Sequence, residues 1–146
     1  ETRTPVIYCP RASAYFHAER AFGPHRYREM LRAGIPVALG TDSAINLPLA
    51  SPGGALERIS VLDEMRLLFR RDGTDPVTLL AMGTTNAAMI LGLDASRFLL
   101  SRGSRPIGLV AVPVEGEVGR RDASAVEWLK SAFRADSAPS LLWMWK

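Results

Sequence analysis

The chain alternates between short unbroken runs of apolar residues and longer stretches in which apolar residues recur at helical spacing. One run, Ile35–Leu39, has no polar interruption, and an earlier run, Val6–Cys9, is rich in β-branched and aromatic side chains. Unbroken runs of this length are typical of strands buried on both faces, as in a parallel sheet covered by helices. Pro10 and Gly40 end the two runs, so we expect a strand at each.

The residues between these strands predict a helix. Gly23-Pro24 is a typical helix start, and Gly34 followed by Pro36 ends it. The apolar stripe consists of Tyr27, Met30 and Leu31. A strand, a helix and a second strand in this order predict a βαβ unit with parallel strands and a right-handed crossover. We expect residues 11–23 to form a polar loop at the carboxyl end of the first strand.

Two apolar helices are expected after the second strand. Residues 44–55 contain too many prolines and glycines to form an element, and helical spacing then predicts a helix over residues 56–71. Asp75-Pro76 is a cap followed by proline, and it starts another helix that reaches Gly92 with a break near Gly83. Both helices are more apolar than a surface helix requires, so we expect them to pack on the sheet.

The remaining residues predict one strand and one helix. Residues 107–114 have the composition of a strand, but Pro113 within them favours an edge position. Residues 124–133 have the spacing of a short amphipathic helix. The tail, residues 140–146, is strongly apolar. We expect either that it docks into the core or that the native chain continues beyond it.

Composition narrows the class of protein. With 146 residues, 47% of them hydrophobic, the chain can bury one core. The net charge is +3, but the arginines are scattered and only two lysines occur, which argues against nucleic-acid binding. The single cysteine, Cys9, cannot form an intrachain disulfide, so we expect a reducing, cytoplasmic setting. No apolar run is long enough for a membrane span. Because the chain starts at Glu1, we expect it to be a piece of a longer protein.

The strongest candidate for a functional residue is Asp42. It follows the buried run Ile35–Leu39 and Gly40, and ligands collect at the carboxyl ends of parallel strands. The simpler alternative is a carboxylate that caps the turn after the strand. Ser13 and His17 lie after the first strand and are candidates for substrate binding, although a solvated loop position is the favoured explanation of His17.

Other chemistry-bearing residues have simpler explanations. Cys9, in a buried strand, is expected to act as a small hydrophobic residue and not as a nucleophile. Glu64 is expected either on a solvated helix face or in an ion pair with Arg66 or Arg70. His25, near arginines at a helix start, is expected at the surface.

Four sequence blocks, in order, resemble the amidohydrolase superfamily, in particular its cytosine-deaminase and chlorohydrolase-like branch. The resemblance covers roughly residues 5–93, with blocks at 6–13, 30–43, 61–66 and 81–93. The first block carries Cys-Pro-x followed by Ala12-Ser13 where the family has Ser-Asn, and the second ends in Gly-Thr-Asp-Ser with Asp42. The first two blocks are similar to the seventh and eighth strands of the family's barrel, and the last two to the helices that follow.

The resemblance implies an α/β fold, the carboxyl-terminal portion of a TIM-type (β/α)₈ barrel, over residues 1–93. Residues 94–146 would be a flanking region with part of a small β domain, although the aspartate typical of that domain is absent. The implied reaction is hydrolysis of C–N bonds in a small heterocyclic amine or amide by metal-activated water. Asp42 would bind a divalent metal, zinc or iron, and would act as the base that accepts a proton from the attacking water. The resemblance is also compatible with a homo-oligomer.

The family's histidine ligands belong upstream of this sequence, and His17 and His25 fall at neither ligand position. The resemblance therefore implies that this chain is inactive alone. Two alternatives remain open: a non-catalytic barrel remnant that serves assembly, and a small α/β binding module.

Overall fold

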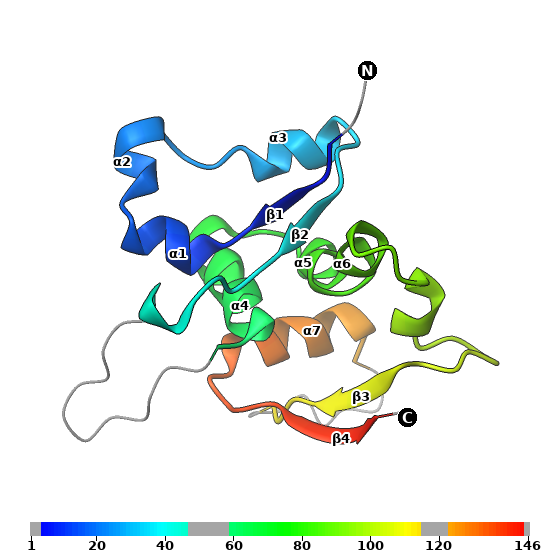
Figure 1. Cartoon of the computed structure of the whole chain (residues 1–146). Coiled ribbons are helices and arrows are strands. Elements are labelled where there is room, and N and C mark those ends of the chain that lie inside the picture. The colour runs from blue at the N-terminus through cyan, green and yellow to red at the C-terminus, as the bar shows by residue number, and fades with distance from the viewer. Residues whose placement is uncertain (1–3, 47–58, 115–122, 145–146) are drawn as a thin grey trace.

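A computed structural model describes residues 4–46, 59–114 and 123–144 of the chain, which has a mixed α/β fold (Figure 1). Two strands, β1 (Val6–Tyr8) and β2 (Val37–Leu39), pair in parallel, with Tyr8 opposite Leu39. Two others, β3 (Gly108–Ala111) and β4 (Ser140–Met144), pair antiparallel in a separate sheet. The helices that follow β2 in the sequence lie between the two sheets in Figure 1. The predicted strands and their parallel pairing are confirmed.

The connection after β1 is not the loop that the sequence predicted. Residues 11–23 lie largely in two short helices, α1 (Pro10–Tyr15) and α2 (Ala18–Phe22). Pro10 opens α1 at a position where its missing N–H costs nothing, and alanines supply helix propensity. His17, with a left-handed φ of 53°, separates the two helices.

The helix before β2 is shorter than predicted. It is α3 (Tyr27–Arg32), and it begins three residues after Pro24 without a side-chain cap. Gly34 follows its end with a φ of 74°, a left-handed conformation that glycine adopts without a steric penalty. The chain can therefore turn directly from α3 into β2.

Both apolar helices after β2 form and pack against it, as predicted. They are α4 (Val61–Asp72), and α5 (Pro76–Gly83) continued by α6 (Thr85–Ile90) after a break at Thr84. The side chains of Ser60 and Asp75 cap α4 and α5. The predicted start of α4, at residues 56–58, lies outside the described residues. Asn86 on α6 donates its Nδ2 to the carbonyl oxygen of Val37, 3.0 Å away, at the outer edge of β2.

The core joins one face of the β1–β2 sheet to the helices. A cluster of buried side chains unites them: Tyr8, Tyr27, Val37, Leu39, Met65, Leu68, Leu79, Met82 and Phe133. Each such side chain stabilises the fold by about 1.5–3 kcal/mol relative to exposure. By contrast Ile7, the neighbour of Tyr8 that points to the opposite face, is 54% exposed. On that opposite face Ile7 of β1 is open to solvent, whereas its register partner Ala38 of β2 is buried at 2% exposure.

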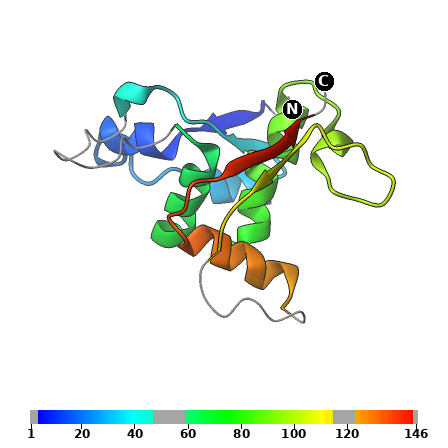
Figure 2. The same cartoon turned by 90° about the horizontal axis from the view of Figure 1, so that it is seen from below.

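The C-terminal part contains the predicted strand and helix. A short 3₁₀ helix, η2 (Ala95–Phe98), precedes β3, and α7 (Ala125–Arg134) starts with a capping box between Ser124 and Glu127. Among the described residues β3 pairs only with β4, as an edge strand would. The apolar tail forms β4, which pairs with β3, and residues 145–146 lie outside the described residues. Seen from below in Figure 2, β3 and β4 cross in front of the helices. No helix in the described ranges is long and apolar enough to cross a bilayer.

Candidate functional site

Asp42 lies three residues after β2, at its carboxyl end, and its side chain is exposed. Its backbone is left-handed, with a φ of 58°, a conformation that aspartate tolerates better than most residues. Oδ2 of Asp42 accepts a hydrogen bond of 2.6 Å from Nδ2 of Asn46. Asn46 ends the short 3₁₀ helix η1 (Ala44–Asn46). This contact orients the carboxylate while leaving it open to solvent.

Asn46 itself is unusual for a polar residue. It is only 2% exposed, and its Oδ1 has no hydrogen-bond partner among the described residues. An unsatisfied buried polar atom costs about 1–3 kcal/mol, so such atoms are rare in folded proteins. The sequence interpretation missed Asn46. The available signal was its position four residues after the candidate carboxylate, within reach of it in a tight turn.

Gly40 makes the strand ends approach closely at this site. A Cβ atom at Gly40 would lie 2.8 Å from Cγ2 of Ile7 and 2.9 Å from Sγ of Cys9, too close for any other residue without a shift. The pKa of the Cys9 thiol is raised, first by burial and then by the negative charges of Asp42 and Glu64. A thiol with a raised pKa stays neutral. Cys9 is half-buried and caps the start of α1, however, and does not lie within the buried strand where the sequence placed it.

The prediction for Glu64 is wrong in both its exposure and its partner. Glu64 is fully buried and binds Arg11, whose backbone N–H donates to Oε2 at 3.0 Å and whose Nε donates to Oε1 at 2.5 Å. The two expected partners bind elsewhere: Arg66 to Asp63, and Arg70 to Asp136. Because Arg11 lies in the first turn of α1, this pair ties the end of β1 to the start of α4, at the same end of the sheet as Asp42.

His25 is not the surface residue that the sequence suggested. It is half-buried, and its ring stacks on Tyr8 with a centroid distance of 3.8 Å and an interplanar angle of 7°. Its Nδ1 is buried without a partner among the described residues. Burial lowers its pKa, and the charge of Arg71 lowers it further, against a weaker opposite effect of Glu19. His25 is therefore neutral at pH 7 and contributes to packing.

The two residues predicted to bind substrate lie on elements near this end of the sheet. Ser13 is half-buried on α1, which packs against η1 and hence beside the Asp42 segment. His17 is exposed at the start of α2. Within the described residues no hydrogen bond joins either side chain to Asp42 or Asn46, so their role stays a prediction.

The described residues do not form a complete metal site. Nowhere in the described ranges do three histidine, cysteine, aspartate or glutamate residues gather closely enough to hold an ion. A catalytic zinc site takes three protein ligands and a water. Asp42, exposed and oriented by Asn46, is suited to supply one of them. In a complete metal site, this chain would thus supply one ligand, the carboxylate of Asp42.

The candidate carboxylate thus lies beyond the carboxyl end of a parallel strand in a mixed α/β fold whose helices pack on the sheet. The sequence profile of the amidohydrolase family matches residues 3–98, more than half of the chain. The chain belongs to the amidohydrolase family. Neither the curated proteins nor the solved structures include a match to it.

Proposed function

We propose that this chain is the carboxyl-terminal part of a metal-dependent amidohydrolase of the cytosine-deaminase and chlorohydrolase-like branch. In this proposal β1 and β2 are the last two strands of a (β/α)₈ barrel, and residues 94–146 flank it. The parallel pairing of β1 with β2 and the packing of α4–α6 on one face support this placement. The exposed Ile7 on the opposite face supports it too, because barrel strands bury both faces.

The proposed reaction is hydrolysis of a C–N bond in a small heterocyclic amine or amide. When bound, a divalent metal, zinc or iron, lowers the pKa of its water to about 7. Asp42 supplies one ligand and accepts the proton of the attacking water at its carboxylate. Asn46 holds that carboxylate in a single orientation. Ser13 and His17 would contact the substrate from α1 and the start of α2.

The observation that carries the proposal is the pair Asp42–Asn46 at the end of β2, in a chain of this family. The test is Asp42→Asn in the intact gene product, because amide and carboxylate have nearly the same size. We expect turnover to fall at least about a hundredfold, the scale of a general base. Zinc and iron content, measured by elemental analysis on the same preparations, should fall as well.

Two results would contradict the proposal. A variant with ordinary turnover would remove Asp42 from the mechanism. An intact protein that binds no divalent metal and hydrolyses no C–N bond would favour a non-catalytic barrel remnant instead. Circular dichroism of both proteins is the control for folding.

A further inference from the structure

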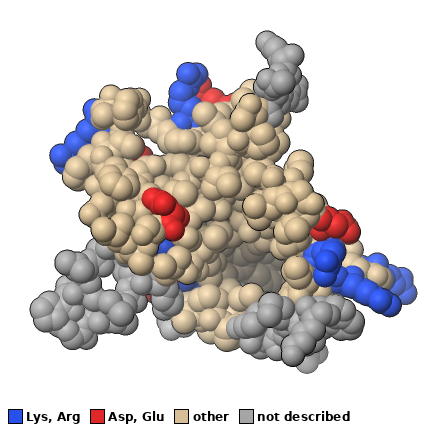
Figure 3. All heavy atoms as spheres, viewed as in Figure 1, with Lys and Arg blue, Asp and Glu red and all other residues tan. Residues whose placement is uncertain are grey.

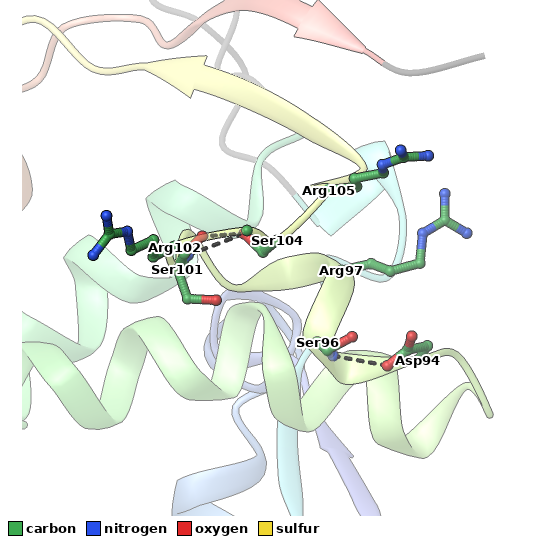
Figure 4. Close-up of a pocket in the computed structure, with 8 residues that line it drawn as sticks. Asp94, Ser96, Arg97, Ser101, Arg102, Ser104 and Arg105 are labelled. Carbon is green, nitrogen blue, oxygen red and sulfur yellow. Dashed lines mark hydrogen bonds between the residues drawn. The ribbon is translucent and has the colours of Figure 1, made fainter.

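A cavity of about 570 Å³ lies between η2 and the loop that follows it, away from the candidate site (Figure 4). Three arginines line it: Arg97, Arg102 and Arg105. The side chains of Arg97 and Arg105 extend to the same side of the loop, and Arg102 extends to the other. In Figure 3 basic side chains gather at the edge of the molecule where this segment lies.

The charges of this cavity are unbalanced. Asp94 is its one acidic residue among the described residues, so three arginines against one aspartate leave two positive charges. Hydrogen bonds from Ser96 lower the pKa of Asp94, and its Oδ1 accepts the Ser96 N–H at 3.0 Å. No guanidinium of the three makes a hydrogen bond or ion pair with a residue in the described ranges. Their donors are therefore open to a ligand.

The backbone that carries these arginines is fixed by local hydrogen bonds. Oγ of Ser104 accepts the N–H of Ser101 at 3.0 Å, and its own hydroxyl lies 2.8 Å from the Ser101 carbonyl oxygen. Gly103 makes the turn between them with a φ of 80°. The N–H of Ile107 donates to the carbonyl oxygen of Arg97 at 2.8 Å, which ties the end of the loop to η2. A fixed loop lowers the entropy lost when a ligand binds.

We propose that this cavity binds the phosphate group of a small phosphorylated molecule. The planar fork of an arginine matches two phosphate oxygens, and two arginines on one side of the loop can hold one group together. A phosphate monoester near neutral pH carries close to two negative charges, which are opposite in sign to the net charge of the cavity. The volume lies within the range of small-molecule sites. The proposal does not depend on the hydrolase activity, because neither Asp42 nor Asn46 lines the cavity.

The test is calorimetric titration of the intact gene product with inorganic phosphate and with glycerol 3-phosphate, at constant ionic strength against sodium chloride. We expect saturable binding of both and none of glycerol. Arg97→Gln and Arg105→Gln should each weaken binding about tenfold, the scale of a charge-assisted hydrogen bond. Arg20→Gln is the matched control, because Arg20 is an exposed arginine on α2 outside the cavity. It should leave binding unchanged.

Three results would overturn the proposal. The first is an absence of saturable phosphate binding by a folded protein. The second is equal weakening by Arg20→Gln and by the cavity variants, which would mean a general charge effect. The third is binding to a single-stranded oligonucleotide or to phosphatidic acid vesicles without binding to the soluble phosphates, which would point to a macromolecular or membrane ligand.

Discussion

The carboxylate of Glu64 on α4 holds both the backbone N–H and the guanidinium of Arg11 on α1, and its side chain is fully buried while that of Arg11 is 11% exposed. The two residues are 53 positions apart in the sequence. A bidentate pair of this kind fixes the direction in which the chain leaves β1. It thereby positions α1, which carries Ser13, beside the segment of Asp42.

Glu64→Gln should destabilise the protein strongly, because it removes the buried carboxylate charge that accepts hydrogen bonds from the backbone N–H and the guanidinium of Arg11. Removal of one partner of a buried ion pair costs about 3–5 kcal/mol. Urea unfolding measures the change. Glu29→Gln is the matched control, since Glu29 pairs with Arg26 at the surface and its loss should change stability little. Equal effects of the two substitutions would show that the buried pair has no special role.

Gly40→Ala should destabilise the protein by about 1–3 kcal/mol, the usual cost of overpacking. The new methyl group would meet Cγ2 of Ile7 and Sγ of Cys9 at less than 3 Å. Cys9→Ala removes one of these two atoms, so the double variant should lose less stability than the sum of the single variants. A double-mutant cycle by urea unfolding measures this coupling. Strict additivity would mean that Sγ of Cys9 does not limit the space at Gly40.

Asn46→Ala should reduce turnover of the intact enzyme about tenfold or more, if Asp42 acts as proposed. Loss of the Nδ2 donor frees the carboxylate to rotate, and residues that orient metal ligands typically affect metal affinity or activity by 10–100-fold. Turnover and metal content should be measured together. Unchanged values of both would show that Asn46 does not position Asp42.

Protonation of His25 should destabilise the folded protein as the pH falls below about 6.5, the ordinary pKa of histidine. Its pKa in the folded state is lowered, so between that lower value and 6.5 the unfolded chain binds more protons than the folded one. Stability is therefore complete above pH 6.5 and is lost as the pH decreases towards the folded pKa. His25→Phe keeps an aromatic ring to stack on Tyr8 and should flatten this dependence. His17→Asn, at the exposed histidine, should not, and thermal unfolding between pH 5 and 8 compares the variants.

The sequence predicted the helices and strands that are determined by residues close together in the chain. β1 and β2 were predictable because an unbroken apolar run with defined ends leaves few alternatives, and α5 because Asp75-Pro76 is a strong start signal. The short helices α1 and α2 were not, because helices of this length do not form by propensity alone. Contacts with distant residues accompany them, such as Arg11 with Glu64 and Glu19 with Arg71.

The candidate site shows the same division. The position of Asp42 after a buried strand was visible in the sequence, and the family match agrees with the resemblance from which its role was inferred. The hydrogen bond from Asn46 depends on the left-handed turn at Asp42, and a pattern of hydrophobic and polar positions does not encode such a turn. The buried position of His25 depends on Tyr8 and Arg71, which come from other elements.

The hydrogen bond from Asn86 to Val37 has a consequence for any strand that adds to the outer edge of β2. Along a parallel strand alternate residues face opposite neighbours, so Val37 and Leu39 direct their carbonyl groups outward while Ala38 faces β1. The carbonyl of Val37 is already engaged by an amide side chain. The outward carbonyl of Leu39, one step closer to Asp42, accepts no hydrogen bond from the residues that the structure describes, so an added strand would find its first acceptor there. Asn86 would therefore limit the register in which another strand can pair with β2, and so would determine which residue of that strand lies beside the carboxylate of Asp42.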